Sequence, residues 1–389
     1  MTERAQTTRH MSTGLLKVVE RAKRDPNAQF NSLAHLLDVE ALRRAFGRTR
    51  RGAAIGVDGV TKEEYAEDLE NNLQALHARL KAKQYRHQLI RRVHIPKAPD
   101  KTRPIGISCI EDKIVQGALS EVLEAIYEED FLDCSYGFRP KRSAHDALRA
   151  LNSMVCQENI GWILEADIQA FFDSLVRARL REMLQIRVVD GSLLRLVGKC
   201  LRVGVLDGER YESPDEGTAQ GSRLSPLLGN LYLHHVLDRW FEGTVRPRLR
   251  GHARLIRYCD DFVIGFQFQD DAERVMEVLG KRMGRFGLKL HPDKTRLMPF
   301  KRPRKGAPKD SSGETFDFLG FTLYWRRNQA GAWAFGMKTR KARLQRTLRP
   351  STIGVAVTGT SRGKISTLRS PDVFEGTTTT SRSMETIGA

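Results

Sequence analysis

A pair of adjacent acids inside an apolar run constrains this chain more than any other feature. The run spans residues 255–266 and is interrupted in its middle by Asp260 and Asp261. Two carboxylates flanked by apolar strands repel each other and lose hydration, which is costly unless a cation lies beside them. The pattern therefore predicts a β-hairpin with two acids at its tip, where a divalent ion such as Mg²⁺ finds oxygen ligands. An ordinary exposed turn is the other interpretation, because Asp is common in turns.

A third acid favours the metal interpretation. Asp167 lies at the end of another apolar, strand-like segment, residues 162–168. Adjacent strands of one sheet can bring Asp167 beside Asp260, although 93 residues separate the two in the sequence. Three carboxylates around one point suit two divalent ions about 3.5–4 Å apart, the arrangement used for phosphoryl transfer. The basic segment 97–103 can supply the cations that a triphosphate also needs.

The charge balance indicates a polyanionic partner. Lys and Arg number 65 against 47 Asp and Glu, which gives a formal net charge of +18. Nucleic acid is the partner that such a surplus favours first, and an anionic membrane second. No apolar stretch reaches the roughly 20 residues of a membrane span, and residues 1–10 are polar, so we expect a cytoplasmic protein without a signal peptide. Five scattered cysteines without a C-x-x-C pair argue against a disulfide framework or a structural zinc site.

Apolar spacing predicts a mixture of helices and strands. Apolar residues recur every three or four positions over residues 114–126, which predicts a helix. Another helix is expected to begin near Ser143, where Asp146 completes a capping-box pattern. Residues 89–95 and the two halves of 255–266 have the pattern of strands.

The chain resembles the reverse transcriptases encoded by group II introns in seven motifs that occur in the same order. Together these motifs lie within roughly residues 50–345, and their order makes the resemblance specific. They are VHIPK…KTRPIGI (93–107), SYGFRP…SAH (135–145), DI…FFD (167–173), GTAQG…LSPLLGN (217–230), YCDD (258–261), GL…KT (287–295) and FLGF (318–321).

The resemblance implies an α+β right-hand polymerase with fingers and a palm, in which helices flank an antiparallel palm sheet. Full-length relatives continue into a thumb, whereas the composition of this chain changes after Pro350. We therefore expect a copy truncated at the thumb, with that domain mostly missing. The expected segments are a basic helical extension (1–52), fingers (53–161), a palm with the polymerase motifs (162–337), the start of a thumb helix (338–350) and a disordered tail (351–389).

The resemblance also assigns the catalytic roles. Asp167, Asp260 and Asp261 match the metal-binding triad of the family, and Ile168 would add its backbone carbonyl as a ligand. Two Mg²⁺ ions are the implied cofactor. One would activate a primer 3′-hydroxyl, and the other would stabilise the leaving pyrophosphate.

Five further positions match residues that contact the incoming nucleotide. Lys97 and Arg103 would clamp the triphosphate, and Gln220 and Gly221 would line the pocket. Phe172 stands where the family packs a side chain under the deoxyribose and excludes a 2′-hydroxyl. A core aromatic is the alternative interpretation of Phe172, since buried Phe is common.

Three cations complete the expected site. Lys294 is a candidate proton donor or phosphate contact, with an ordinary surface lysine as the alternative. Arg139 and Lys141 are candidate template contacts, and both are equally consistent with structural cations of a loop.

The implied function is RNA-directed DNA synthesis, in which dNTPs are added to a DNA or RNA primer on an RNA template such as intron RNA. Two alternatives stay open: an RNA-binding splicing factor (maturase), and a defence-associated reverse transcriptase, each with weak or lost polymerase activity. Changing Asp260 to Ala separates polymerisation from RNA binding. The sequence leaves open which RNA is bound, whether the chain is active and what its oligomeric state is.

Overall fold

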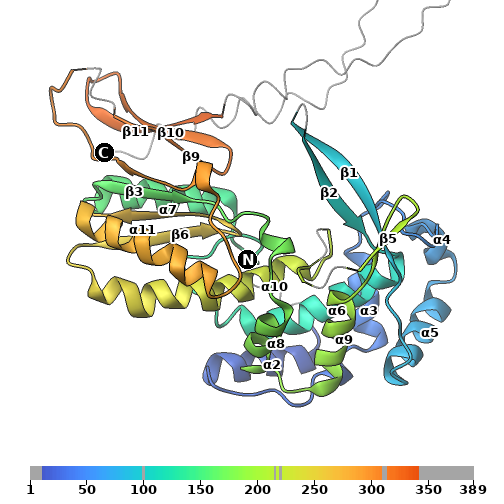
Figure 1. Ribbon diagram of the computed structural model, residues 1–389. Coiled ribbons are helices and arrows are strands. Elements are labelled where there is room, and N and C mark those ends of the chain that lie inside the picture. Colours follow the sequence, from blue (N-terminus) through green and yellow to red (C-terminus); the bar gives the residue numbers. More distant parts are fainter. Residues whose placement is uncertain (1–10, 99–100, 214–215, 219–220, 309–312, 341–389) are drawn as a thin grey trace, which may run out of the picture. The chain divides into compact units, whose positions relative to one another are not determined.

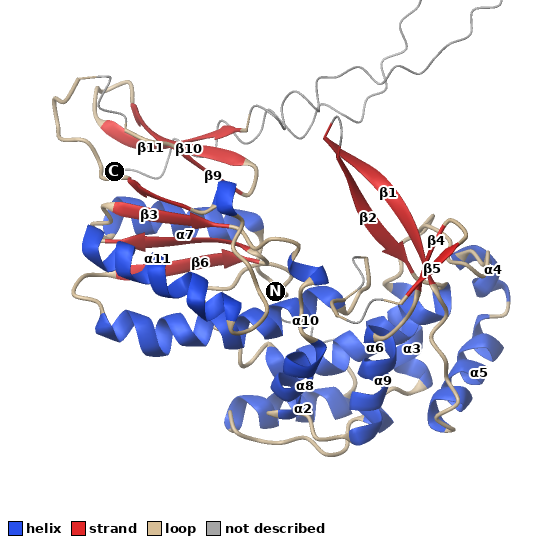
Figure 2. Cartoon of the chain, in the orientation of Figure 1, coloured by secondary structure: helices blue, strands red, loops and turns tan. Residues whose placement is uncertain are grey.

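Three β-sheets and a set of packed helices make up the described part of the chain (Figures 1 and 2). The structure is a computed structural model. The described residues are 11–98, 101–213, 216–218, 221–308 and 313–340.

The sheet that carries the acids, here called the central sheet, has four strands in the order β6-β7-β3-β8. Every neighbouring pair in it is antiparallel. Strands β6 and β7 form the hairpin that the apolar run predicts. The strands are β6 (Ala253–Tyr258), β7 (Asp261–Phe266), β3 (Trp162–Ala166) and β8 (Arg296–Pro299).

Helices cover both faces of the central sheet, which explains why its strands are apolar at nearly every position. Ile163 belongs to a core cluster that contains the apolar face of α7 (Ala144–Gln157). Its neighbour Leu164 points to the opposite face and belongs to the cluster that contains α11 (Gln269–Gly284). A strand buried on both faces has no polar side to alternate with. The prediction of an antiparallel sheet flanked by helices is therefore confirmed.

A second sheet, of three antiparallel strands, packs into the same cluster as α7 through Trp325 and Trp333. Its last strand continues through Lys338 and Thr339, so the expectation that a helix begins at residue 338 is wrong at its first two positions. These residues pair in register with β10, and this pairing holds them in the extended conformation of a strand. The rest of the expected thumb helix and tail, 341–389, lies outside the described residues. The strands are β9 (Phe316–Phe318), β10 (Phe321–Arg327) and β11 (Trp333–Thr339).

The third sheet contains a long hairpin built from β1 and β2. Strand β1 pairs with β2 in antiparallel and with β4 in parallel orientation. The hairpin carries the basic segment that the sequence assigns to phosphate binding. The strands are β1 (Ile90–Ala98), β2 (Lys101–Ile107), β4 (Val205–Asp207) and β5 (Arg210–Glu212).

Helix α6 (Ile110–Tyr127) lies at the centre of the packed helices, and most of its residues are buried. It contacts α2, α3, α9 and α10. A pattern apolar on nearly all sides is expected for a helix enclosed by others. The remaining helices are α2 (Thr13–Arg24), α3 (Val39–Gly47), α4 (Lys62–Glu67), α5 (Leu69–Lys81), α8 (Arg177–Gln185), α9 (Gly191–Leu201) and α10 (Ser225–Leu233), which π-helical turns at His234–Asp238 and Phe241–Val245 follow.

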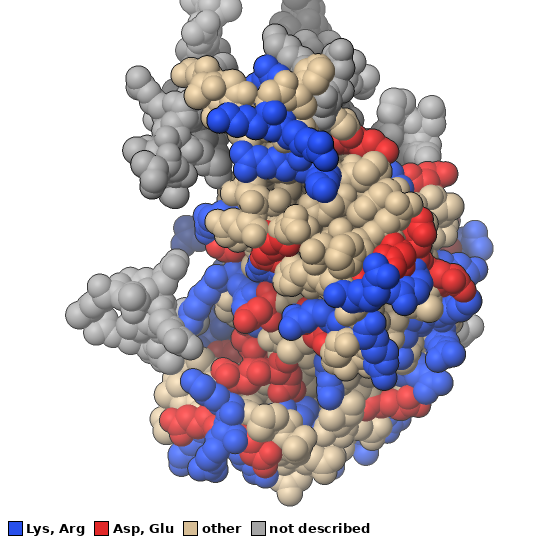
Figure 3. Space-filling model, turned by 90° about the vertical axis from the view of Figure 1, so that its left-hand side faces the viewer, with Lys and Arg blue, Asp and Glu red and all other residues tan. Residues whose placement is uncertain are grey.

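Basic and acidic side chains are mixed over the face shown in Figure 3, where Lys and Arg are the more numerous. The distribution of charged side chains on this face therefore does not define a single binding path for a polyanion. None of the helices in the described ranges has the length and apolar character needed to cross a bilayer.

Candidate active site

Strand register brings the three acids together at one end of the central sheet. Ala166 of β3 pairs with Phe262 of β7, so the next residues outward, Asp167 and Asp261, lie opposite each other. Tyr258 of β6 pairs with Asp261, which leaves Cys259 and Asp260 as the two-residue turn of the hairpin. Residues 93 positions apart thus share one site, as the sequence predicts.

The hairpin turn has a backbone that few side chains tolerate. Cys259 has a φ of 60°, in the left-handed region that residues with a Cβ seldom adopt. A positive φ at the first loop position is what a tight two-residue hairpin needs. Gly137 packs directly on this turn, since a Cβ built there would lie 2.4 Å from the Cys259 amide nitrogen. The turn is therefore held by the loop at residues 135–140 as well as by its own strands.

The carboxyl groups are crowded enough to shift their ionisation. Burial raises the pKa of Asp261 to about 7, and the negative charges of Asp260 and Asp167 act in the same direction. Burial also raises the pKa of Asp260, with a further contribution from Asp167, while Arg103 opposes it. Like charges held this close ionise together only when a cation offsets the repulsion.

Lys294 supplies one such cation by forming an ion pair with Asp167. Its position follows from backbone pairing. The His291 amide donates to the Asp167 carbonyl at 2.8 Å, and Ile168 forms a β-bridge with Leu290. The short helix η6 (Pro292–Lys294) follows, and its last residue, Lys294, lies beside Asp167. The structure thus brings Lys294 into the candidate site.

The acids fit a hard divalent cation in their chemistry. Within the described ranges, no group of three or more His, Cys, Asp or Glu side chains is arranged tightly enough to define a metal centre by itself. The fit rests instead on Asp167, Asp260 and Asp261, because burial, with a smaller contribution from their mutual repulsion, raises the pKa values of Asp260 and Asp261. A divalent ion with oxygen ligands relieves that repulsion.

Phe172 lies on the short helix η2 (Phe171–Asp173), which begins four residues after Asp167 in the sequence. Its ring is half-buried and lies 5.1 Å from that of Phe171, centroid to centroid. The Phe172 carbonyl accepts a hydrogen bond of 2.7 Å from the Thr218 amide, so the loop after β5 is fixed to this turn. The ring is neither a fully buried core residue nor a free one.

Gly221 joins the same loop to the long hairpin. Its φ is 107°, and a Cβ there would lie 2.3 Å from the Gly106 carbonyl oxygen of β2. Only glycine allows so close an approach of two backbones. Gln220, which the sequence assigns to the same pocket, lies outside the described residues.

The structure describes the side chain of one of the two predicted phosphate contacts on the long hairpin, Arg103, but not that of Lys97. Arg103 is exposed on β2, and its charge opposes the rise that burial causes in the pKa values of Asp260 and Asp173. The charge of Arg103 thus acts on Asp260, and its role as a phosphate clamp stays a prediction. Lys97 lies on β1, one position from the residue that pairs with Thr102, and its side chain lies outside the described part.

The structure contradicts the prediction that Arg139 contacts RNA. Its side chain is 4% exposed, and its guanidinium donates to Glu128 and to the carbonyls of Leu132 and Ser135. It also lies over the Phe131 ring, with its central carbon 5.4 Å from the ring centroid. Its donors are engaged inside the protein, so its role is to shape the loop. Lys141, in contrast, is exposed.

Sequence reasoning missed a buried polar network under the hairpin turn. The Arg257 guanidinium binds both carboxylate oxygens of Asp238 at 2.7 and 2.6 Å, and neither side chain is exposed. It also donates to Asn230, to the Ser135 hydroxyl and to the Cys259 carbonyl at 2.9, 2.7 and 2.9 Å. The available signal was an arginine next to the apolar pair Leu255 and Ile256 of a predicted strand, where burial requires partners.

The family model for reverse transcriptase (RNA-dependent DNA polymerase) matches residues 95–323, more than half of the chain. The chain belongs to the reverse transcriptase family. The matched range contains the three acids, the buried network and the long hairpin from residue 95 onward, so the family match covers the candidate site.

Several proteins similar to this reverse transcriptase are named as intron proteins. Protein YkfC of Escherichia coli K12 is 34% identical over 307 residues, which cover 71% of this chain and 77% of that protein. Group II intron-encoded protein LtrA of Lactococcus lactis is 37% identical over 55% of this chain, but over 37% of its own length. An uncharacterised 91 kDa protein in the cob intron of Schizosaccharomyces pombe is 42% identical over 42% of this chain and 20% of its own. The match thus spans a minor part of the last two relatives.

Proposed function

We propose that this reverse transcriptase is an RNA-directed DNA polymerase of the group II intron type, which adds dNTPs to a primer 3′-hydroxyl by two-metal phosphoryl transfer. The observation that carries the proposal is the convergence of Asp167 with Asp260 and Asp261 at one end of the central sheet. Two similar proteins are named as intron proteins, which agrees with intron RNA as the template.

Asp167, Asp260 and Asp261, with the backbone carbonyl of Ile168, would hold two Mg²⁺ ions. When bound, these ions lower the pKa of the primer hydroxyl and neutralise charge on the pyrophosphate that leaves. The other residues of the site would align the reacting groups, because phosphoryl transfer depends mainly on alignment and on charge stabilisation.

The long hairpin would bind the triphosphate through Arg103 and Lys97. Arg103 already acts on the charge of Asp260, so a triphosphate between the two would meet a cation on one side and the acids on the other. Lys294 would either give a proton to the leaving group or contact phosphate, since its ammonium lies at Asp167.

The sugar and base would lie against the loop that joins η2 to the long hairpin. Phe172 would pack under the deoxyribose and exclude a 2′-hydroxyl, while Gln220 and Gly221 line the pocket. Lys141 would contact the template backbone from the exposed loop at residues 135–142.

Primer extension on an RNA template with a DNA primer, dNTPs and Mg²⁺ tests the proposal. We expect the wild-type chain to extend the primer and the Asp260→Asn variant to show no extension, because the amide cannot supply the negative charge. Asp270→Asn is the matched control, since Asp270 is half-exposed on α11 and its carboxylate pairs with the exposed Arg250. A variant at Asp260 that extends as well as the control variant refutes the proposal.

A splicing factor that binds intron RNA is the second candidate. It is favoured by the similarity to Nuclear intron maturase 2, mitochondrial, of Arabidopsis thaliana, which is 32% identical over 36% of this chain. The two functions differ at the acids, because RNA binding does not need Asp260. Retention of intron RNA binding and splicing by a chain that never extends a primer selects the maturase.

A further inference from the structure

Phe138 is an exposed aromatic residue in a loop that is otherwise well packed. Its side chain is 61% exposed, the largest exposure among the large hydrophobic residues of the described ranges. The residues on either side, Gly137 and Arg139, are both buried. Its φ is 54°, a left-handed conformation that is a genuine outlier for a bulky side chain. Such strain persists only where the surroundings fix it, and it tends to occur at binding sites.

The exposure of the ring does not come from a loose loop. Asn230 donates a hydrogen bond of 2.7 Å to the Gly137 carbonyl, from a side chain that is itself buried. On the other side, the guanidinium of Arg139 is fixed to Glu128 and to two carbonyls. The backbone on both sides of Phe138 is thus anchored, and the ring is held outward.

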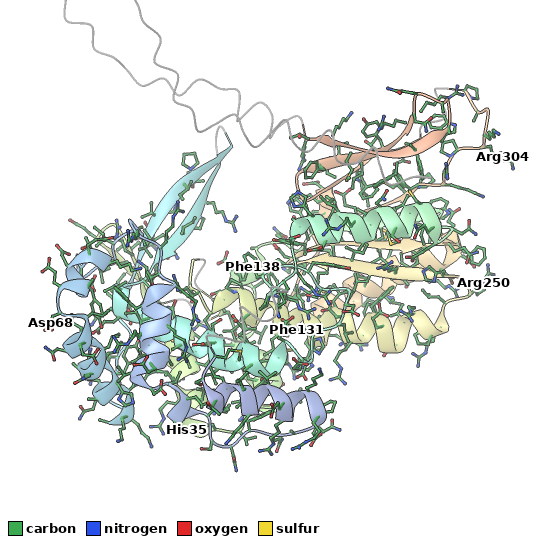
Figure 4. All side chains as sticks on the ribbon, turned by 180° about the vertical axis from the view of Figure 1, so that it is seen from behind. His35, Asp68, Phe131, Phe138, Arg250 and Arg304 are labelled. Carbon is green, nitrogen blue, oxygen red and sulfur yellow. The ribbon has the colours of Figure 1, made fainter. Side chains whose placement is uncertain are left out.

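The ring lies next to the turn that carries the catalytic acids. Its centroid is 6.4 Å from that of Tyr258, the last residue of β6 before the turn. Gly137 touches the Cys259 backbone directly. Figure 4 shows Phe138 near the ends of the strands of the central sheet. Water therefore reaches an apolar ring next to the hairpin turn that contains Asp260, where a nucleic acid would pass if the proposed function holds.

A cation accompanies the ring on the same loop. Lys141 is exposed and has a φ of 63°, so the loop presents an aromatic side chain and an ammonium from two left-handed positions three residues apart. Aromatic rings that stack on bases, together with cations that bind phosphates, are the usual means of holding a nucleic acid strand.

We propose that the Phe138 ring packs directly against a base or sugar of the primer–template beside the growing end, as an apolar contact that holds this end over the acids. The inference rests on the proposed function for the identity of its ligand. It assigns a binding role to a residue that is exposed, has a left-handed backbone conformation and lies beside the hairpin turn.

The test measures binding separately from catalysis. A fluorescein-labelled RNA template annealed to a DNA primer is titrated with the full chain in EDTA, and anisotropy gives Kd. We expect Phe138→Ala to raise Kd about 5- to 150-fold, the range for loss of a base–aromatic contact. Phe138→Trp should keep Kd near the wild-type value, because it preserves an aromatic face.

Phe138→Gly separates binding from folding. Glycine adopts the left-handed conformation freely, so this variant should melt at or above the wild-type temperature while it binds as weakly as Phe138→Ala. The matched control is Phe268→Ala, since Phe268 is also partly exposed but precedes α11 at the other end of β7. Its Kd should stay at the wild-type value.

The outcomes distinguish this inference from the proposed function. A Kd of Phe138→Gly within twofold of wild type, in a folded variant, overturns the role of the ring even if the wild type extends primers. Weak binding by Phe138→Gly together with no extension by the wild type supports the ring contact and refutes polymerisation. A loss of binding equal in Phe268→Ala also overturns the inference, because the effect would then not belong to this site.

Discussion

Arg257 and Asp238 form a two-point ion pair from which solvent is fully excluded. The same guanidinium donates to the Cys259 carbonyl, one residue before the acid Asp260. It also binds Ser135, so it connects the hairpin turn to the loop that presents Phe138. A buried charge therefore fixes the turn of the candidate active site.

Removing one member of this pair should be strongly destabilising. Changing Asp238 to Asn leaves the Arg257 charge buried without its counter-charge, which costs about 3–5 kcal/mol in comparable buried pairs. Urea unfolding, followed by circular dichroism, measures the loss. Changing the exposed Glu273 to Gln on α11 serves as the control and should change stability by less than about 0.5 kcal/mol. Equal stabilities of the two variants would contradict the structural role of the pair.

Crowding of the acids predicts an unusual pH dependence of stability in the absence of divalent ions. The pKa of Asp261 is raised from 3.8 to about 7 in the folded chain, so the folded state binds more protons than the unfolded one. The stabilisation that the folded chain gains from the proton on Asp261 is complete below pH 3.8 and is lost as the pH rises towards 7. Asp261→Asn should therefore gain stability over the wild type across this interval.

The measurement is urea unfolding of both proteins in EDTA at several pH values from 4 to 8. The difference in unfolding free energy between variant and wild type should grow with pH and level off above 7. A difference that stays constant over the range would show that Asp261 ionises normally. Adding Mg²⁺ should reduce the difference, because the ion favours the ionised wild-type carboxylate.

Gly137 should tolerate no side chain. An alanine Cβ would lie 2.4 Å from the Cys259 amide nitrogen, which is backbone and cannot turn aside. We expect Gly137→Ala to displace the turn and to lower kcat of primer extension at least tenfold. Steady-state kinetics, together with thermal melting, separates a shifted turn from an unfolded chain.

Gly280→Ala is the matched control, since Gly280 lies inside α11 and a Cβ at this position would meet nothing within 4 Å. Alanine is the better helix former by about 1 kcal/mol, so this variant should be slightly more stable and fully active. Wild-type kcat in Gly137→Ala would show that the loop does not position the turn.

Phe172 should set the choice between dNTPs and rNTPs. Changing it to Val shortens the side chain next to Phe171 and opens the space expected for a 2′-hydroxyl. The ratio of kcat/KM for dNTP over rNTP should fall roughly 10- to 200-fold, the range for a small steric change in a pocket. Phe172→Tyr should keep the wild-type ratio. An unchanged ratio in Phe172→Val would mean that the ring is only a packing residue.

Local patterns in the sequence predict the elements of this fold well. The helix expected over 114–126 is α6 at 110–127, and the capping box at Ser143 and Asp146 is present at the start of α7. These features depend on neighbours in the sequence, so spacing reveals them. The hairpin at 255–266 follows for the same reason.

Side-chain surroundings are what the sequence hides. Arg139 looks like a template contact by position, but it is neutralised by Glu128, the residue that directly follows helix α6. Arg257 stands in a strand pattern without any sign that Asp238 and Asn230 meet it. Both cases depend on contacts between separate elements, which only the folded chain shows.

The close approach of Gly221 to Gly106 has a mechanical consequence. The loop that would touch the incoming nucleotide presses on the base of the β1–β2 hairpin, with no side chain between the two backbones to absorb a displacement. If the hairpin moved towards the triphosphate, it would displace this loop as well. Binding of the phosphates and the shape of the base pocket would then be coupled.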